Sequence, residues 1–258
     1  MNLSDVSKTA IITMTCRATQ SDDPKSEFND EMSVQCLKIL TDIATESEKK
    51  TIRKIGKIYG KYSKNEAKSL VMRVSIIDSI VNDYISKNPE CTVINIACGF
   101  DTRYWRLDKN DCTYIEIDLP EVIEQKRELL GDRIDYEMIS SSVLDFSWID
   151  KVTKDGNGDF ILVMEGLLMY LQEEDVKILL GEISRRFTDS QLVTDALDKK
   201  LTKGLYRKIG NWASKLLLGI ELEWNFGFEK AEDIETYGNY SFISASGKQP
   251  FVITASID

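Results

Sequence analysis

The 258-residue sequence contains no histidine. That absence excludes the Ser-His-Asp and Cys-His catalytic arrangements and zinc sites built on imidazole. It also removes the commonest general base of enzymes, so any proton transfer would have to use an aspartate, a lysine or a tyrosine.

Cysteine patterning is absent as well. The chain has five cysteines without a C-x-x-C pair: Cys16, Cys36, Cys91, Cys98 and Cys112. An odd, scattered set is neither a disulfide framework nor a zinc motif, and it suits a reducing compartment. We therefore expect a cytoplasmic protein without a metal ion.

Long apolar runs and a basic excess are missing too. No apolar run reaches the roughly 20 residues that cross a bilayer, and the N-terminus lacks the features of a signal peptide. Acidic residues outnumber basic ones by 43 to 33, giving a formal net charge of −10. Nucleic acids and anionic membranes attract basic surfaces, so we expect neither as the main partner. The expected partner is a small molecule or a protein, and no oligomeric state is indicated.

The first ninety residues are predicted to be mainly helical. Apolar residues recur at a three- to four-residue spacing over Met32–Ile43 and again over Leu70–Ile85. Asn88-Pro89 then ends the second helix, because the residue before a proline disfavours the α region.

From residue 90 onwards, short apolar runs alternate with helical segments. Two helices are predicted there, Pro120–Leu130 and Glu173–Phe187. The candidate strands are Val93–Cys98, Thr113–Asp118, Asp135–Ser140, Phe160–Glu165, Gln191–Ala196, and a final pair, Tyr240–Ala245 and Pro250–Ala255, that the turn 246–249 joins as a hairpin. This alternation predicts an α/β fold with a doubly wound, mostly parallel, seven-stranded sheet.

We interpret the whole chain, residues 1–258, as one domain with four parts. They are a helical N-terminal cap (1–89), a ligand-binding core (90–198), a helical insertion (199–230) and a terminal strand pair (231–258). The insertion contains the aromatic residues Tyr206, Trp212, Trp224 and Phe226. These residues either line a substrate pocket beside the cap or pack a helical core, and packing is the favoured interpretation. No catalytic residue is assigned.

The first β-to-α turn and the end of the next strand suggest a nucleoside. Gly99 allows a sharp turn and a close approach of the backbone to a ligand. Asp118 follows 19 positions later, where nucleotide-binding folds place the carboxylate that accepts hydrogen bonds from a ribose. Each residue alone is an ordinary turn residue, and the two together favour a nucleoside ligand.

A dinucleotide is disfavoured by the same turn. The G-x-G-x-x-G fingerprint requires three glycines, and this chain has Ala97, Gly99 and Thr102 at those positions. A phosphate-free nucleoside such as S-adenosylmethionine makes smaller demands on the turn. A nicotinamide dehydrogenase is therefore the least favoured enzyme.

Four ordered segments resemble the leucine carboxyl methyltransferase family, which includes the O-methyltransferases associated with polyketide synthesis. The segments are Thr9-Ala10, Arg17-Ala18, Arg73 and Asp78 upstream; V-I-N-I-A-C-G-F-D-T-R-Y-W-R-L at Val93–Leu107; E-I-D-L-P-E-V-I-E-Q-K at Glu116–Lys126; and E-G-L-L-M-Y-L at Glu165–Leu171. The likeness covers most of residues 5–185 and fades beyond residue 200. It implies a Rossmann-like, class I methyltransferase that uses S-adenosylmethionine.

The resemblance implies cofactor contacts at particular positions. Arg73 would bind the methionine carboxylate with its guanidinium fork, although a surface arginine is the alternative. Asp118 would bind the ribose, and Glu165 would lie against the methionine end unless it caps the next helix. The other expected cofactor contacts are Ala97, Cys98 and Gly99 in the first turn, Leu119 after Asp118, and Ser142, Val143 and Asp145 after the third strand.

Two positions depart from the family's pattern. Ala97 replaces the usual first glycine, and we expect it to be tolerated if its φ stays negative. Where the family commonly has Asp-Leu followed closely by another Asp, this chain has Ser142-Val143-Leu144-Asp145. Either Ser142 replaces the carboxylate that contacts adenine, or Asp145 contacts adenine from a shifted position.

The reaction implied is in-line transfer of a sulfonium methyl group to an oxygen, which leaves S-adenosylhomocysteine. A carboxylate acceptor is ionised near pH 7, whereas a phenol, with a pKa of about 10, benefits from a base. Because histidine is absent, we favour the carboxylate of a small molecule as acceptor. The alternatives are the C-terminal carboxyl group of a protein and a cofactor-binding module without catalysis.

Overall fold

The structure is a computed structural model, and it describes residues 5–58, 64–109, 111–154, 158–204, 223–247 and 250–258. Its strands form one sheet of seven, in the order β3-β2-β1-β4-β5-β7-β6. The strands are β1 (Thr92–Ile96), β2 (Thr113–Asp118), β3 (Glu137–Ser140), β4 (Phe160–Met164), β5 (Ser190–Ala196), β6 (Tyr240–Ser246) and β7 (Phe251–Ile257). The predicted seven-stranded sheet is confirmed.

The order of the strands creates a place for a ligand. Strands β1 to β5 pair in parallel, and β7 lies antiparallel between β5 and β6. The chain runs outward from β1 to β2 and β3, and it then returns to β4 on the other side of β1. Where the strand order reverses in this way, the loops diverge and leave a crevice at the carboxyl ends of the strands. A ligand site is therefore expected beyond β1, β2 and β4.

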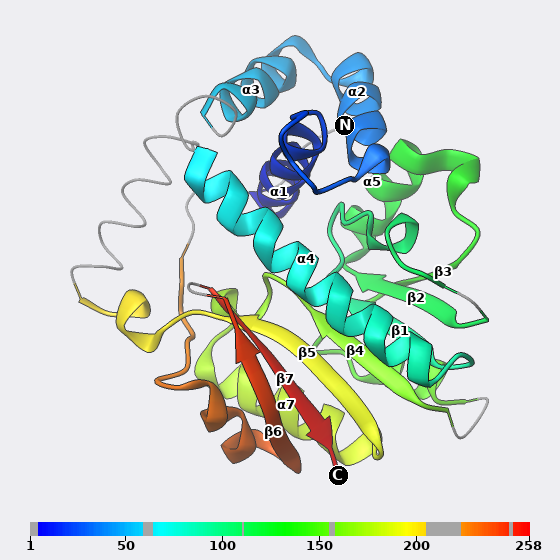
Figure 1. Ribbon diagram of the computed structural model, residues 1–258, viewed down its shortest axis with the longest axis vertical. Coiled ribbons are helices and arrows are strands. Elements are labelled where there is room, and N and C mark those ends of the chain that lie inside the picture. Colours follow the sequence, from blue (N-terminus) through cyan, green and yellow to red (C-terminus); the bar gives the residue numbers. More distant parts are fainter. Residues whose placement is uncertain (1–4, 59–63, 110, 155–157, 205–222, 248–249) are drawn as a thin grey trace.

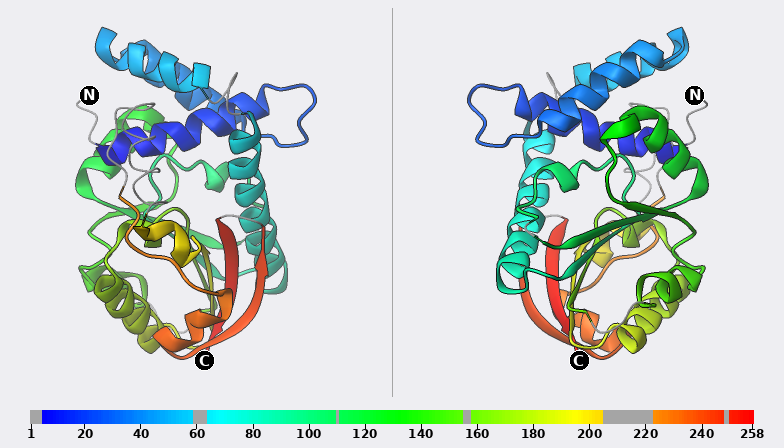
Figure 2. Two further views of the ribbon diagram at one scale, coloured as in Figure 1. Left: turned by 90° about the vertical axis from the view of Figure 1, so that its left-hand side faces the viewer. Right: turned by 90° about the vertical axis from the view of Figure 1, so that its right-hand side faces the viewer.

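Helices cover both faces of the sheet (Figures 1 and 2). On one face lie α4 (Lys64–Lys87), whose Ile77, Val81 and Ile85 pack on the valines of β1, β4 and β5, and α5 (Pro120–Leu130) beside β2 and β3. On the other face, α6 (Ser147–Val152) and α7 (Glu173–Arg186) pack on the isoleucines and leucines of the same strands. Buried strands with apolar residues on both sides are the expected core of a doubly wound sheet.

Three N-terminal helices form a cap beyond one end of the sheet, at the top of both views in Figure 2. They are α1 (Asp5–Ser21), α2 (Glu31–Ile43) and α3 (Glu46–Lys57). The Arg17 guanidinium of α1 donates to the carbonyl oxygen of Phe100 at 2.7 Å, and Phe100 packs in the apolar cluster of the cap. The cap therefore rests on the loop that follows β1, at the carboxyl ends of the strands.

Most predicted boundaries lie within a few residues of the observed ones. Helix α5 has the predicted bounds, while α4 begins six residues before the predicted Leu70. Strand β1 ends at Ile96 and not at Cys98, because Ala97 turns the backbone into the left-handed region. The short 3-10 helices are η2 (Arg103–Trp105), η3 (Gly131–Arg133), η4 (Leu168–Tyr170), η5 (Lys199–Thr202) and η6 (Ala231–Tyr237).

The predicted helical insertion is described only at its two ends. Residues 205–222, which include Tyr206 and Trp212, lie outside the described residues. At the described ends, Lys199–Thr202 forms one 3-10 turn, and Phe228 pairs with Asp198 in an isolated bridge. The turn of the predicted hairpin also includes two residues, 248 and 249, outside the described ranges, but its strands pair antiparallel as expected.

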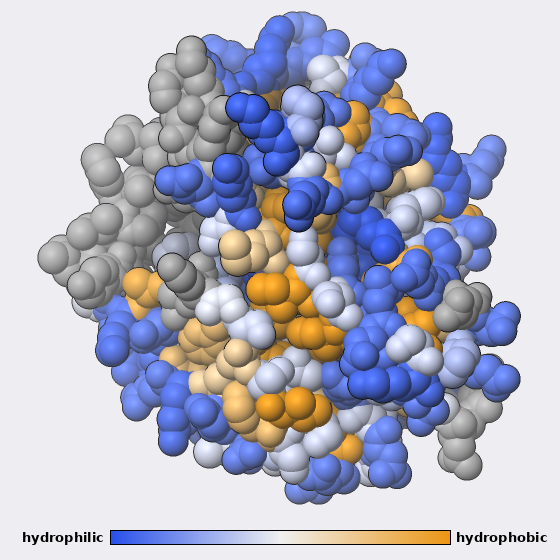
Figure 3. Space-filling view, viewed as in Figure 1, coloured by the Kyte–Doolittle hydropathy of each residue, from blue (hydrophilic) through white to orange (hydrophobic). Residues whose placement is uncertain are grey.

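One apolar strip is visible on the surface where α4 passes the β6 edge of the sheet (Figure 3). Met72 and Ile243 are more than half exposed there. They adjoin a shallow groove of about 360 Å³ that is lined by Met72, Ser75, Ile76, Ser79, Ile80, Ser244 and Ser246. Among the described residues, no helix has both the length and the apolar character to cross a membrane.

Candidate active site

The turn after β1 is bonded to the end of β2. The Gly99 N–H donates to Asp118 Oδ2 at 2.6 Å, and the Leu119 N–H donates to Oδ1 at 2.7 Å. Burial raises the pKa of Asp118, although these two backbone hydrogen bonds oppose the shift. An ionised carboxylate has about four acceptor positions, so each oxygen can still accept one ribose hydroxyl. Gly99 and Asp118 therefore lie together as a nucleoside site requires.

Ala97 adopts a left-handed backbone conformation. Its φ is +54°, and that of Gly99 is +51°. We expected the alanine to be tolerated if its φ stays negative, and this condition is not met. The left-handed region costs an L-residue roughly 1–2 kcal/mol, because Cβ crowds the following carbonyl oxygen. The glycine that the family usually has at this position avoids that cost.

Cys98 lies between these two residues and is buried. Burial raises the pKa of its thiol well above the usual value, so the thiol stays protonated at neutral pH. The thiol makes a weak polar contact, donating to the Gly99 carbonyl oxygen over 3.7 Å. Cys98 therefore contributes packing to the turn, and its backbone is the part that can face a ligand.

Arg73 and Glu165 meet beyond the end of β4, although 92 residues separate them in the sequence. Arg73 Nε and Nη2 both donate to Glu165 Oε1, at 3.1 and 2.8 Å. Burial alone would raise the pKa of Glu165, but Arg73 and Arg103 outweigh it and hold the pKa below its usual value. The alternative for Arg73, a surface arginine, is ruled out by a side chain that is only 11% exposed.

Asp195 completes this end of the site and was not singled out from the sequence. Its Oδ2 lies 2.8 Å from Arg73 Nη1, and its Oδ1 accepts the Gly166 N–H at 2.6 Å. The signal in the sequence was the run Leu192-Val193-Thr194-Asp195, an apolar strand ending in a carboxylate as β2 does. The family resemblance did not indicate Asp195, because this segment lies beyond the family's motifs.

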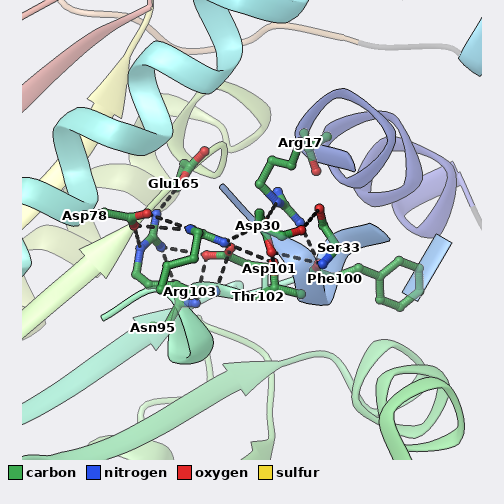
Figure 4. Close-up of polar contacts among 12 residues, drawn as sticks. Arg17, Asp30, Ser33, Asp78, Asn95, Phe100, Asp101, Thr102, Arg103 and Glu165 are labelled. Carbon is green, nitrogen blue, oxygen red and sulfur yellow. Dashed lines mark hydrogen bonds and ion pairs between the residues drawn. The ribbon is translucent and has the colours of Figure 1, made fainter. Parts of the chain in front are cut away.

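A continuous network of buried ion pairs links this end of the site to the N-terminal cap. Figure 4 shows Arg103 between Asp78, Asp101 and Glu165, and Arg17 turned toward Asp30. Arg103 is fully buried, and its nitrogens lie 2.6 to 2.7 Å from the three carboxylates. The whole network contains five carboxylates and four guanidinium groups: Asp30, Asp78, Asp101, Glu165, Asp195, Arg17, Arg73, Arg103 and Arg106.

The predicted adenine segment follows β3 and lies next to β2. The Ser141 N–H donates to the carbonyl oxygen of Asp118 at 2.9 Å, which places Ser142 and the buried Val143 beside the ribose position. The exposed Asp145 carboxylate instead accepts the Ser147 N–H at 3.2 Å, in the first turn of α6. The Ser142 hydroxyl likewise accepts the Leu144 N–H at 3.2 Å, so the choice between Ser142 and Asp145 as the adenine contact stays a prediction.

The aromatic residues of the insertion divide between two roles. Phe226 is buried and packs edge-on against Phe228 and Tyr237, so packing is the correct interpretation for it. Trp224 lies beside Tyr170, and its buried indole nitrogen has no hydrogen-bond partner among the described residues. The segment around Trp224 is attached to the loop after β4, because the Asn225 backbone N–H donates to the Met169 carbonyl oxygen at 2.8 Å. Tyr170 lies near Arg73, and a pocket-lining role for Trp224 stays a prediction.

The site residues follow the order of the strands across the sheet. Ser142 follows β3, Asp118 ends β2, Gly99 follows β1, Glu165 follows β4 and Asp195 lies in β5. An adenine, a ribose and a charged amino-acid tail can be held in that order. Arg73 fits the carboxylate of such a tail, because a guanidinium has five N–H groups and the three bonds described above leave one on each terminal nitrogen. The residues present therefore fit S-adenosylmethionine.

Comparison with known proteins shows the family of the chain. The family model described as "Leucine carboxyl methyltransferase" matches residues 10–184. The chain is 27% identical over 198 residues to the "Tetracenomycin polyketide synthesis O-methyltransferase TcmP" of Streptomyces glaucescens, covering 76% of this chain and 68% of the relative. It is 25% identical over 198 residues to the "S-adenosyl-L-methionine-dependent methyltransferase dpfgK" of Gibberella zeae, covering 74% of this chain and 64% of that protein.

Solved structures show the same fold at low sequence identity. Magnesium protoporphyrin IX methyltransferase (ChlM) from Synechocystis PCC 6803, with bound SAH, superimposes with a TM-score of 0.51 at 13% identity. That match covers 86% of this chain and 99% of the other. The family model covers well over half of the chain. The chain therefore belongs to the leucine carboxyl methyltransferase family of S-adenosylmethionine-dependent methyltransferases.

Proposed function

We propose that the protein transfers the methyl group of S-adenosylmethionine to an oxygen atom of a small molecule, with a carboxylate favoured over a hydroxyl group. The observation that carries the proposal is the row formed by Asp118, Gly99, Glu165 and Arg73 along one edge of the sheet. The relative TcmP, which is named an O-methyltransferase of polyketide synthesis, supports an oxygen acceptor.

The chain's own contribution is to hold the two ends of the cofactor. Bound S-adenosylmethionine supplies an electrophilic methyl carbon on a positively charged sulfur. Asp118 accepts hydrogen bonds from the ribose hydroxyls, and Arg73 donates its two remaining N–H groups to the amino-acid carboxylate. With both ends fixed, the acceptor oxygen need only be held in line with the carbon–sulfur bond, and such positioning can supply several kcal/mol of the rate enhancement.

The side chains near Arg73 support an acceptor that needs no base. Burial raises the pKa of the Tyr170 phenol, although Arg73 opposes the shift, so this group stays protonated at neutral pH. Asp195 is fully buried, so its oxygens are not accessible to an acceptor. Neither the Tyr170 phenol nor the Asp195 carboxylate is therefore available to take a proton from a phenol acceptor. A carboxylate acceptor is already ionised near pH 7.

The test is transfer of a radiolabelled methyl group from S-adenosylmethionine to matched panels of small carboxylic acids, phenols and peptides with a free C-terminal carboxylate. Methyl esters release methanol in mild base and methyl ethers do not, so the product class can be assigned without knowing the natural acceptor. We expect base-labile label on at least one carboxylic acid. We also expect the R73M variant to lose transfer, because it loses its hold on the cofactor.

Three outcomes would contradict the proposal. Label found only in base-stable ethers would make the carboxylate preference wrong and leave O-methylation intact. Label transferred only to peptides with a free C-terminal carboxylate would favour the protein methyltransferase instead. Cofactor binding without transfer to any panel member would favour the non-catalytic module.

A further inference from the structure

Asp195 is a buried carboxylate that the proposed contacts with the cofactor do not use. It lies next to the last residue of β5, and no part of its surface is exposed. It also lies beyond residue 184, where the match to the family model ends. An ionisable side chain in a strand interior is costly unless it is paired, so its pairing requires an explanation.

The contacts of Asp195 join three elements. Its Oδ2 binds the Arg73 guanidinium of α4, and its Oδ1 binds the backbone N–H of Gly166 after β4. Gly166 has a φ of +69°, so this N–H belongs to a tight turn immediately after Glu165. Asp195 thus bonds Arg73 and also the turn after Glu165, which is the other carboxylate that binds Arg73.

Arg73 is therefore held from two directions. Glu165 Oε1 bonds its Nε and Nη2 on one side, and Asp195 Oδ2 bonds Nη1 on the other. A guanidinium bonded along only one side can still pivot about that carboxylate. The second carboxylate removes this freedom and fixes the plane of the group, which determines where the two remaining N–H groups point.

We propose that Asp195 is a positioning residue that, together with Glu165, orients Arg73 toward the amino-acid carboxylate of the cofactor. This inference rests on the proposed contact between Arg73 and that carboxylate. It makes a specific demand: Asp195 matters for ligands that carry the amino-acid tail and not for ligands that lack it. A residue that merely stabilises the fold would affect both.

The experiment is calorimetric titration with S-adenosylhomocysteine and with 5′-methylthioadenosine, which has the same nucleoside and thioether but no amino-acid tail. The native chain is compared with D195N, R73M and the D195N/R73M double variant. D195N keeps the size of the side chain and cannot accept from both Arg73 and Gly166. D83N is the matched control, because it makes the same change on an exposed part of α4.

We expect D195N to weaken S-adenosylhomocysteine binding about tenfold, the effect of losing an oriented hydrogen bond to a charged group. Binding of 5′-methylthioadenosine should be unchanged in every variant, which also shows that the site remains folded. Adding D195N to R73M should have no further effect, because Asp195 acts through Arg73. D83N should bind both ligands as the native chain does.

Three results would overturn the inference. If D195N loses the same affinity for both ligands, Asp195 merely stabilises the fold. If D195N binds S-adenosylhomocysteine as tightly as the native chain or more tightly, Asp195 does not orient Arg73. If R73M binds S-adenosylhomocysteine as tightly as the native chain, the Arg73 contact itself is wrong and Asp195 has nothing to position. That last result separates a failure of the proposed function from a failure of this inference alone.

Discussion

Ala97 is the clearest case in which a single residue opposes the conformation that its position requires. Its φ of +54° is imposed by the turn between β1 and the Gly99–Asp118 hydrogen bond. Non-glycine residues that are held in this region cluster at functional sites, where the surrounding structure maintains them. Here the next residue but one, Gly99, has nearly the same φ. The turn therefore needs two left-handed residues and has only one glycine.

Replacing Ala97 with glycine should stabilise the protein. Removing Cβ relieves roughly 1–2 kcal/mol of left-handed strain, while the greater freedom of glycine in the unfolded chain costs about 0.4–1 kcal/mol. We expect a net increase of about 1 kcal/mol in the free energy of unfolding, measured by urea denaturation. The control is A67G in the buried face of α4, where glycine should instead cost about 1 kcal/mol or more. A loss of stability in A97G would mean that the turn tolerates alanine without strain.

At the scale of elements, one buried ion pair fastens α5 to β2. Lys126 Nζ of α5 lies 2.7 Å from Glu116 Oε2 of β2, and both side chains are almost completely buried. Glu116 also accepts from the Tyr114 hydroxyl at 3.4 Å. Because Asp118 ends the same strand and α5 begins two residues later, this pair supports the turn that holds the ribose carboxylate.

Removing one partner of this pair should cost far more than removing both charges. We expect K126M to lose about 3–5 kcal/mol of unfolding free energy, since it leaves Glu116 buried without a counter-ion. The double variant E116Q/K126M should recover most of that loss, because neither charge remains. The control is K87M, which removes an exposed pair and should change stability little. Equal losses in the single and double variants would show that packing, and not charge, is what matters.

The elements themselves were largely predictable because their signals are local. Pro120 at the first turn of α5 and the apolar spacing of α7 depend on a few neighbouring residues, and both helices were found. The sheet followed from the alternation of strands and helices. Short elements such as α6 were not predicted, because six residues are too few to establish a helical period.

The candidate site was predictable only where a motif lay in one segment. Gly99, Asp118 and Glu165 each stand at a strand end, and the resemblance to the family assigned their roles. The partners of Arg73 were not predictable, because Asp195 lies 122 residues away and meets it only after β5 has joined the sheet. The left-handed φ of Ala97 was missed for a related reason, since it depends on the hydrogen bond from Gly99 to another strand.

At the scale of the whole molecule, the ion-pair network joins the cap to the sheet. Arg17 of α1, Asp78 of α4 and Arg103 after β1 lie far apart in the sequence. Burial alone would raise the pKa of Asp101, but Arg103 and Arg106 outweigh it and hold the pKa well below its usual value. The same balance lowers the pKa of Glu165. A carboxyl group whose pKa is lowered by folding stabilises the folded state at neutral pH and loses that contribution as acid protonates it.

Replacing Arg103 with methionine should therefore destabilise the protein in a pH-dependent way. At pH 7 the loss should be about 3–5 kcal/mol, because three buried carboxylates lose a shared counter-ion. Without Arg103, the pKa values of Asp101 and Glu165 rise. As the pH falls toward 4, protonation therefore removes the unpaired buried charges of the variant. In the native protein, the same acidification begins to weaken the ion pairs of the network. The difference between the two proteins should consequently narrow on acidification, measured by urea denaturation at several pH values. R185M, which removes an exposed pair on α7, should have the same stability as the native protein at every pH.

A difference in stability between R103M and the native protein that stays constant from pH 7 to pH 4 would show that Arg103 acts by packing. The cap would then be joined to the sheet by shape and not by charge.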